Sequence, residues 1–138
     1  MKKSWVEKLE NAKPAVVKVL DKNFAGMKSG QRMLLPSPQL IDRYITAIPF
    51  GEERSVQTMR DELAKSHKAD VTCPIATGFM LKTVAEATHE RLSQDGDLAN
   101  ITPIWRLLSP DSKTLKKVSF DHNFVTERRA AEGISDDL

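Results

Sequence analysis

Hydrophobic residues recur at helical spacing in two segments in the first half of the chain. The first segment follows Ser37, a residue type that caps helices, and Pro38, whose missing N–H is tolerated at a first helical position; it ends before Pro49. The second follows Ser55 and continues through Lys65. In both, apolar side chains fall on one face, which predicts two short amphipathic helices.

The strongest helical pattern covers residues 75–92. Pro74 stands in its first turn, and Thr72 or Cys73 precedes it at the capping position. The pattern ends at Gly96, a residue type that readily adopts the left-handed conformation found after helix ends. We therefore predict an extended third helix.

The N-terminal part of the pattern is less regular. Apolar residues within 4–19 follow helical spacing, but Pro14 interrupts them because proline lacks an N–H and clashes with the preceding turn. This predicts a short helix followed by a looser segment. Residues 21–33 are predicted to form a loop, because they include the turn-forming residues Asn23, Gly26, Ser29 and Gly30.

After the third helix, short apolar runs replace the helical spacing. Residues 101–108 are too apolar for a surface loop and predict a buried strand or extended segment. Residues 109–119 mix turn-forming residues with Leu115 and Val118, a pattern typical of a turn flanked by short strands. Residues 125–132 can close the domain as a last helical turn that stops at Gly133.

These elements favour an α+β fold class. Three helices followed by a small β unit are typical of a small winged helix-turn-helix-like domain, mostly helical, with a short β wing and an N-terminal extension. We place a basic N-terminal extension at residues 1–33, packed on or flanking the domain. The winged-helix domain then covers residues 34–133, and an acidic tail covers residues 134–138.

Composition excludes several classes of protein. The 138 residues are enough for one domain, and 40% hydrophobic with 29% charged residues is typical of globular chains. The single cysteine, Cys73, excludes an internal disulfide and a zinc site built on paired cysteines. No apolar run reaches the ~18 residues of a spanning helix, and residues 1–5 lack the apolar stretch of a secretory signal. We therefore expect a cytoplasmic protein with no membrane partner, no metal and no cofactor.

Charge is distributed unevenly, although the net charge is only +2. Residues 1–33 carry eight Lys or Arg and three Asp or Glu, and residues 109–129 carry five and three. The body between them, residues 34–108, carries eight and ten. A total this small neither demands nor excludes a nucleic-acid partner, but the basic arm and the basic loop region are where phosphate contacts are expected.

Three motifs occur in an order that is specific for one family. Residues 48–55, I-P-F-G-E-E-R-S, resemble the I-P-x-G-x-x-x-S entry to the helix-turn-helix of methylated-DNA–protein cysteine methyltransferases. Residues 75–78, I-A-T-G, are similar to the R-A-V-G that opens their recognition helix, and residues 102–108, T-P-I-W-R-L-L, resemble their active-site segment P-C-H-R-V-[IV]. Residues 34–133 are also similar to an uncharacterised bacterial branch of this superfamily.

The resemblance implies the family's fold without its reaction. Those enzymes move an alkyl group from a flipped guanine onto a cysteine thiolate that a histidine keeps deprotonated. Here Ile104 matches the cysteine and Trp105 the histidine, and neither side chain can attack an alkyl carbon or accept a proton. Ile75 matches the arginine that fills the gap left by the base, and Val56 the tyrosine that turns the nucleotide. We therefore expect no catalytic residue and no enzyme.

The first functional hypothesis is a non-catalytic alkyltransferase-like protein that binds double-stranded DNA, including duplexes with altered bases. Small residues at the start of the recognition helix allow close approach to a groove, and lysines can contact phosphate. The candidate nucleic-acid-binding residues are Ala76, Thr77, Gly78, Lys82, Lys113, Lys116 and Lys117. The degenerate active-site segment consists of Pro103, Ile104, Trp105 and Arg106. A basic face that is merely solvated is the competing interpretation.

Two further hypotheses belong to other classes. The same fold can serve as a protein-interaction module that presents an apolar face. An enzyme could instead use Cys73, because a helix start lowers the pKa of a thiol, but a small buried hydrophobe is the favoured interpretation. Glu86 and Glu90 are interpreted as solvated charges on a polar helix face. For Ile104 and Trp105, core packing is favoured over the lining of a small pocket.

Overall fold

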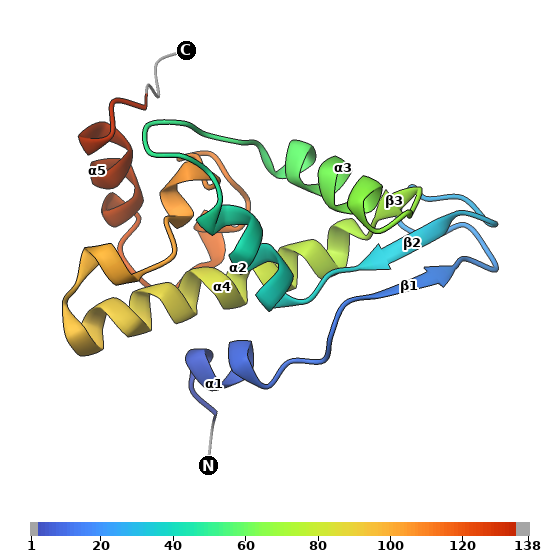
Figure 1. Cartoon of the computed structure of the whole chain (residues 1–138), viewed down its shortest axis with the longest axis horizontal. Coiled ribbons are helices and arrows are strands. Elements are labelled where there is room, and N and C mark those ends of the chain that lie inside the picture. Colours follow the sequence, from blue (N-terminus) through green and yellow to red (C-terminus); the bar gives the residue numbers. More distant parts are fainter. Residues whose placement is uncertain (1–2, 135–138) are drawn as a thin grey trace.

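Helices predominate in the computed structural model, which describes residues 3–134 (Figure 1). The helices are α1 (Trp5–Glu10), α2 (Pro38–Thr46), α3 (Val56–Ser66), α4 (Pro74–Asp95) and α5 (Asn123–Ala131). The strands are β1 (Val16–Val19), β2 (Arg32–Leu35) and β3 (Val71–Thr72), and short 3-10 turns are η1 (Leu98–Asn100), η2 (Ile104–Arg106) and η3 (Leu115–Lys117). The α+β fold class is confirmed. No helix in this described part is long and apolar enough to span a membrane.

The helices predicted from residue spacing are confirmed together with their caps. The Ser37 hydroxyl accepts the backbone N–H of Leu40 at the start of α2, over 3.1 Å. The Ser55 hydroxyl accepts the N–H of Thr58 at the start of α3, over 3.0 Å. Gly96 ends α4 with a φ of +67°, which costs glycine little. These caps fix where α2, α3 and α4 begin and end.

The N-terminal segment is more ordered than its sequence predicts. Residues 16–19 form β1, which pairs antiparallel with β2, and β2 pairs in parallel with β3 to complete a three-stranded sheet. The prediction of a loop through residue 33 is therefore wrong at its C-terminal end. Valines at 16, 17 and 19 suit a strand, and the helix predicted from the preceding spacing ends at Glu10, before Pro14. The predicted boundary between residues 33 and 34 falls inside β2.

The β wing expected at residues 109–119 is a wrong prediction. In the described part of the chain no strand follows β3, and the segment closes through local turns such as Ser112 N–H to Ser109 C=O, over 3.0 Å. Thr114 and Leu115 are consecutive and both are buried, whereas successive side chains of a strand at the surface would point to opposite faces. Residues 101–108 are buried as expected, but they contain η2 instead of a strand.

Helix α4 runs through the middle of the molecule, with the sheet near one end and α5 at the other (Figure 1). Two buried or half-buried acids on it hold neighbouring segments, which corrects their interpretation as solvated charges. The Glu90 carboxylate accepts the backbone N–H groups of Trp5 and Val6 at the start of α1, over 3.0 and 3.2 Å. The Glu86 carboxylate accepts both the N–H and the hydroxyl of Ser119, over 2.9 and 2.7 Å. These bonds fix α1 and the 109–119 loop against α4.

Of the predicted acidic tail, only Ile134 belongs to the described part of the chain, and it is buried. The other residues of the tail, 135–138, lie outside the described residues.

Candidate functional site

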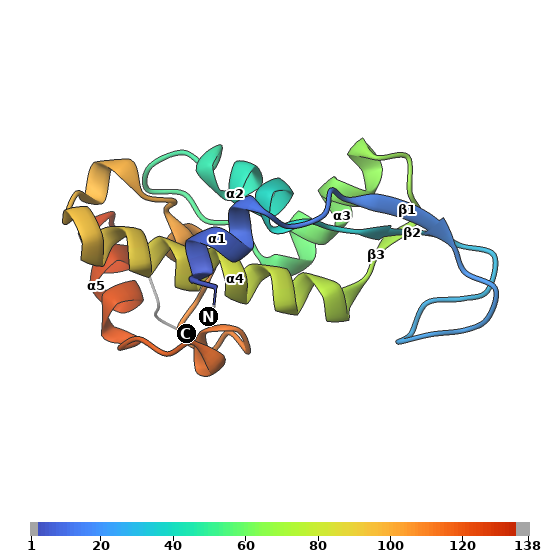
Figure 2. The same cartoon turned by 90° about the horizontal axis from the view of Figure 1, so that it is seen from below.

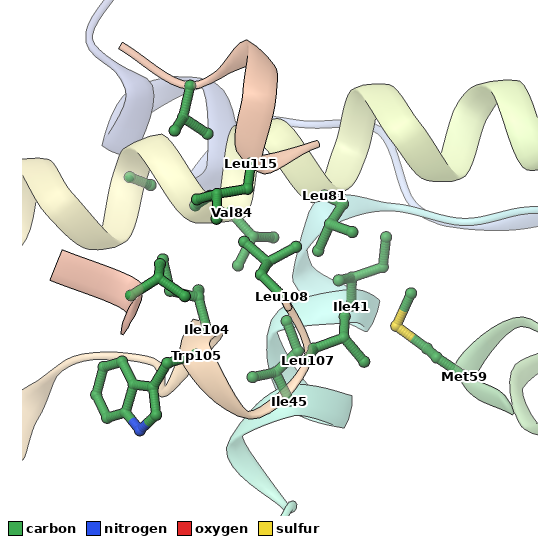
Figure 3. Packing of buried hydrophobic residues seen from close by; sticks show 14 of the residues in the cluster. Ile41, Ile45, Met59, Leu81, Val84, Ile104, Trp105, Leu107, Leu108 and Leu115 are labelled. Carbon is green, nitrogen blue, oxygen red and sulfur yellow. The ribbon is translucent and has the colours of Figure 1, made fainter. Parts of the chain in front are cut away.

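The degenerate active-site segment lies inside the hydrophobic core. Ile104 is fully buried and lies among the core side chains of Figure 3, while Trp105 is 4% exposed and its ring packs edge-on against Phe124 of α5. Pro103 is buried at the start of η2. The interpretation of Ile104 and Trp105 as core residues is confirmed, because neither side chain reaches a surface from which DNA could approach it.

The polar atoms of this segment converge on one carboxylate. Glu132, directly after α5, accepts the indole N–H of Trp105 over 2.6 Å and two guanidinium N–H groups of Arg106 over 2.9 and 3.0 Å. It also accepts the backbone N–H of Gly51, over 2.9 Å. Burial would raise the pKa of Glu132, but the bonds from Arg106, Gly51 and Trp105 outweigh burial and lower that pKa to about 2. Glu132 is therefore an anion at any physiological pH.

Arg129 extends this polar cluster from α5. Its side chain is 2% exposed, and one guanidinium N–H donates to the carbonyl of Trp105 over 2.9 Å. Another donates to the carboxylate of Glu53, over 2.9 Å. Arg106 in turn donates to the carbonyl of Ile48, over 2.8 Å. Where the resemblance places a reaction centre, this chain has a network that joins α5, η2 and the turn before α3.

A cleft of about 810 Å³ lies beside Glu53, the member of the network that also lines it. It lies between the first turns of α3 and α4 and the segment after η2, and we call it the α3/α4 cleft. Its apolar lining comes from Val56, Pro74, Leu81 and Leu107, and its polar lining from Glu53, Arg54, Ser55, Thr58, Arg60, Thr77, Ser109, Asp111, Ser112, Lys113 and Thr114, with Gly78 at the surface. The lining therefore combines a few apolar side chains with a larger number of polar ones, and polar groups in a cleft can fix the orientation of a small organic group.

The charges around the cleft are partly balanced. Arg54 pairs with Glu52 over 3.1 Å, and Glu53 pairs with Arg129. A hydrogen bond from the Ser109 hydroxyl to the Asp111 carboxylate, over 2.7 Å, lowers the pKa of Asp111, which stays ionised. Arg60 donates to the carbonyl of Thr72 over 3.2 Å.

The positive charges of Lys113 and Arg60 are not paired with a carboxylate in the described part of the chain. Within residues 3–134 neither of these two cleft residues forms an ion pair. Of the basic side chains that line the cleft, these two can therefore meet an anion without first giving up a carboxylate partner.

The structure brings together only some of the predicted nucleic-acid-binding residues. Gly78 is exposed and lines the cleft with Lys113. Thr77 also lines it but is only 2% exposed, and its hydroxyl donates to the carbonyl of Cys73 over 2.7 Å. Ala76 is half-buried and packs on a small cluster that contains Cys73. Neither Ala76 nor Thr77 presents a free polar group.

The predicted lysines fall into two places. Lys82 is half-buried, and its ammonium lies 5.5 Å from the centre of the Trp5 ring. Lys116 and Lys117 are exposed in η3, which belongs to the loop that Glu86 holds against α4. In Figure 2 this loop projects on one side of α4.

The exposed face of α4 is apolar at its start. Ile75 is 48% exposed and Phe79 is 71% exposed, one helical turn apart. Large apolar side chains in that position are not needed for the core, so they are available for contact with another molecule.

Cys73 is a buried structural residue. Its side chain is 3% exposed, and its sulfur lies 3.5 Å from the backbone N–H of Ala76. We expect a thiol reagent to leave Cys73 unlabelled under native conditions and to label it completely after unfolding in urea. The measurement is the absorbance of the chromophore that the reagent releases when it reacts. Rapid labelling of the native protein would contradict this result and would support the hypothesis of an enzyme that uses Cys73.

Sequence reasoning missed the residues that shape this region most. Arg54 and Arg60 on the cleft, and Arg129 and Glu132 in the network, look like ordinary surface charges in the sequence. Only the spacing of Arg129 and Glu132 at the end of a helix hinted that both could face the same neighbour. Comparisons of the chain with models of protein families, with curated proteins and with solved structures found no match.

Proposed function

We propose that the protein binds duplex DNA through the surfaces that line the α3/α4 cleft, namely the first turns of α3 and α4 and the segment after η2, and that it transfers no alkyl group. The observation that carries this proposal is the α3/α4 cleft, in which the exposed start of α4 meets the unpaired charges of Arg60 and Lys113. Phosphate contacts by such side chains supply most of the affinity of proteins for DNA.

The arrangement of α2, α3 and α4 supports a helix-turn-helix role. Helix α3 ends at Ser66 and α4 begins at Pro74, so the second helix starts close to the end of the first and exposes its N-terminal turns. In helix-turn-helix proteins these turns of the second helix approach the base edges. The lysines of the 109–119 loop would take the place of a wing beside that helix.

The apolar face of α4 suits a groove. Ile75 and Phe79 stand out from the helix at its start, and proteins that bind the minor groove insert apolar side chains of these types between base steps. The cleft beside them has a volume within the range of sites for small organic groups, so an altered or unpaired base displaced from the duplex can enter it.

The same geometry supports binding without reaction. Ile104 and Trp105 are enclosed in the core, and the cleft instead presents Leu107 and Val56 to an entering base. Neither aliphatic group can accept an alkyl group.

Duplex binding is expected to fall steeply between about 50 and 200 mM salt, because each phosphate contact releases a counterion. The measurement is fluorescence anisotropy with a labelled plain duplex and with the same duplex carrying an alkylated guanine. Lys113→Ala should weaken binding to both duplexes, while Lys65→Ala, an exposed lysine on α3 away from the cleft, should not. Mass spectrometry should show no gain of a methyl group after incubation with the alkylated duplex.

A protein-interaction module is the second candidate, and the exposure of Ile75 and Phe79 favours it. No binding to either duplex at about 50 mM salt would overturn the DNA proposal. If the protein also formed a defined oligomer that Phe79→Ser dissociates, the interaction module would take its place.

A further inference from the structure

Strands β1 and β2 and the connection between them form a hairpin, residues 16–35, which we call the hairpin arm. At its tip, Phe24 and Met27 exchange both backbone hydrogen bonds, over 3.0 and 2.8 Å. Ala25 and Gly26 between them have φ values of +51° and +83°, the signs that a type I′ hairpin turn requires. Closer to the strands, the backbones of Leu20 and Gln31 are bonded over 2.9 Å. Hydrogen bonds within the segment therefore hold its backbone in the hairpin conformation.

The tip of the arm is fixed beside the start of α4. Met27, two residues from the centre of the turn, is 5% exposed and belongs to a small cluster with Met33 and Cys73. Ala76, in the first turn of α4, packs against the same cluster. Figure 2 shows the arm projecting from the end of the sheet, with its tip on the side of α4 on which the 109–119 loop also projects.

The arm is strongly basic. It carries Lys18, Lys22, Lys28 and Arg32 against one acid, Asp21, and all five are exposed. Within residues 3–134 the three lysines form no ion pair. Concentrated positive charge on a protruding, pre-ordered hairpin complements a polyanion and has no role in the core.

We propose that the hairpin arm is a second phosphate-contacting element for the same duplex. This inference rests on the proposed function, because it requires a duplex lying along the exposed face of α4. Such a duplex would meet the lysines of the 109–119 loop toward one end of that face and Lys22 and Lys28 of the arm at the other. Ile75 and Phe79 would lie between the two basic elements, so the three parts form one continuous DNA-binding surface.

The test compares two double variants that each remove two positive charges. Lys22→Ala/Lys28→Ala removes charge from the arm, and Arg43→Ala/Lys65→Ala removes it from exposed positions on α2 and α3. Anisotropy titrations with a labelled plain duplex are made at several salt concentrations. The arm variant should bind about tenfold more weakly at ~100 mM salt, and the slope of log affinity against log salt should fall by about 2. The control variant should match the wild type in both quantities.

A third variant separates loss of contact from loss of fold. Asp21→Asn removes the acid of the arm and should tighten binding, an effect that partial unfolding cannot produce. Equal affinity and equal slope for the wild type, the arm variant and the Asp21 variant would overturn the inference while leaving the proposed function intact. If the wild type itself binds no duplex, the proposed function fails first, and the inference falls with it.

Discussion

Replacing Glu132 by alanine is expected to lower the free energy of unfolding by about 3–5 kcal/mol, because it leaves the buried guanidinium of Arg106 and the indole N–H of Trp105 without their acceptor. The Gly51 N–H loses its partner as well. The measurement is urea unfolding followed by circular dichroism at pH 7. Glu127→Ala, at an exposed glutamate on α5, is the matched control and should stay within about 0.5 kcal/mol of the wild type.

The contribution of Glu132 should depend on pH in one direction. Its pKa is about 2 in the folded protein and 4.5 ordinarily, so the folded state favours the ionised form by about 3 kcal/mol. That stability is fully present above about pH 4.5 and is lost as the pH falls toward 2. The difference in stability between wild type and Glu132→Gln should therefore shrink over this range. A difference that stays constant from pH 7 to pH 2 would show that the carboxylate is not held as described.

Replacing Ile104 by alanine is expected to lower the free energy of unfolding by about 2–5 kcal/mol. The side chain is fully buried among residues of the central core, so its truncation removes apolar contacts and leaves a cavity (Figure 3). Ile75→Ala makes the same chemical change at a position that is 48% exposed and should cost less than about 1 kcal/mol. Equal losses from the two variants would contradict the burial of Ile104.

A second variant at this position tests whether a thiol there can react with an alkylated base. Ile104→Cys restores the residue type that the resemblance places there, but the new thiol would lie in the core beside an indole instead of an imidazole. We expect it to stay unmodified after incubation with an alkylated duplex, as measured by mass spectrometry. Addition of a methyl group would show that the position is accessible and that the family's reaction needs little more than the sulfur.

The sequence predicted those parts of the fold that depend on local signals. Ser37, Ser55 and Gly96 mark helix ends through their own side chains or backbone, and spacing alone places apolar residues on one face of α2 and α3. The apolar character of residues 101–108 predicted their burial, and all of them except the half-buried Arg106 are buried.

The strands could not be predicted in the same way, because their partners are distant. Residues 16–19 are extended because they pair with β2. Residues 71–72 are extended because they pair in parallel with β2, although two helices separate the two strands in the chain. Residues 109–119 include residue types that favour strands, but they form turns and the 3-10 turn η3, with Leu115 buried in the core. Local pattern contains no information on either choice.

The same reason explains what was missed at the candidate site. Glu86, Glu90 and Glu132 look alike in sequence, and their partners lie 33, 85 and 26 positions away in the chain. Which carboxylate is buried is decided by the fold as a whole. Lys113 was identified because its neighbours in sequence are basic, while Arg54 and Arg60 reached the cleft through the packing of α3.

The cluster around Glu132 also has a consequence for the order in which the chain can mature during translation. Gly51 and Glu132 are 81 positions apart, and Glu53 and Arg129 are 76 apart, so synthesis must pass residue 132 before all of these partners can meet. Until then, Arg106 lacks its counter-charge and the Trp105 indole N–H lacks its acceptor, both of which Glu132 supplies. A nascent chain that does not yet include α5 would therefore keep this end of the molecule open to water and to chaperones, and release of α5 would complete it in one cooperative step.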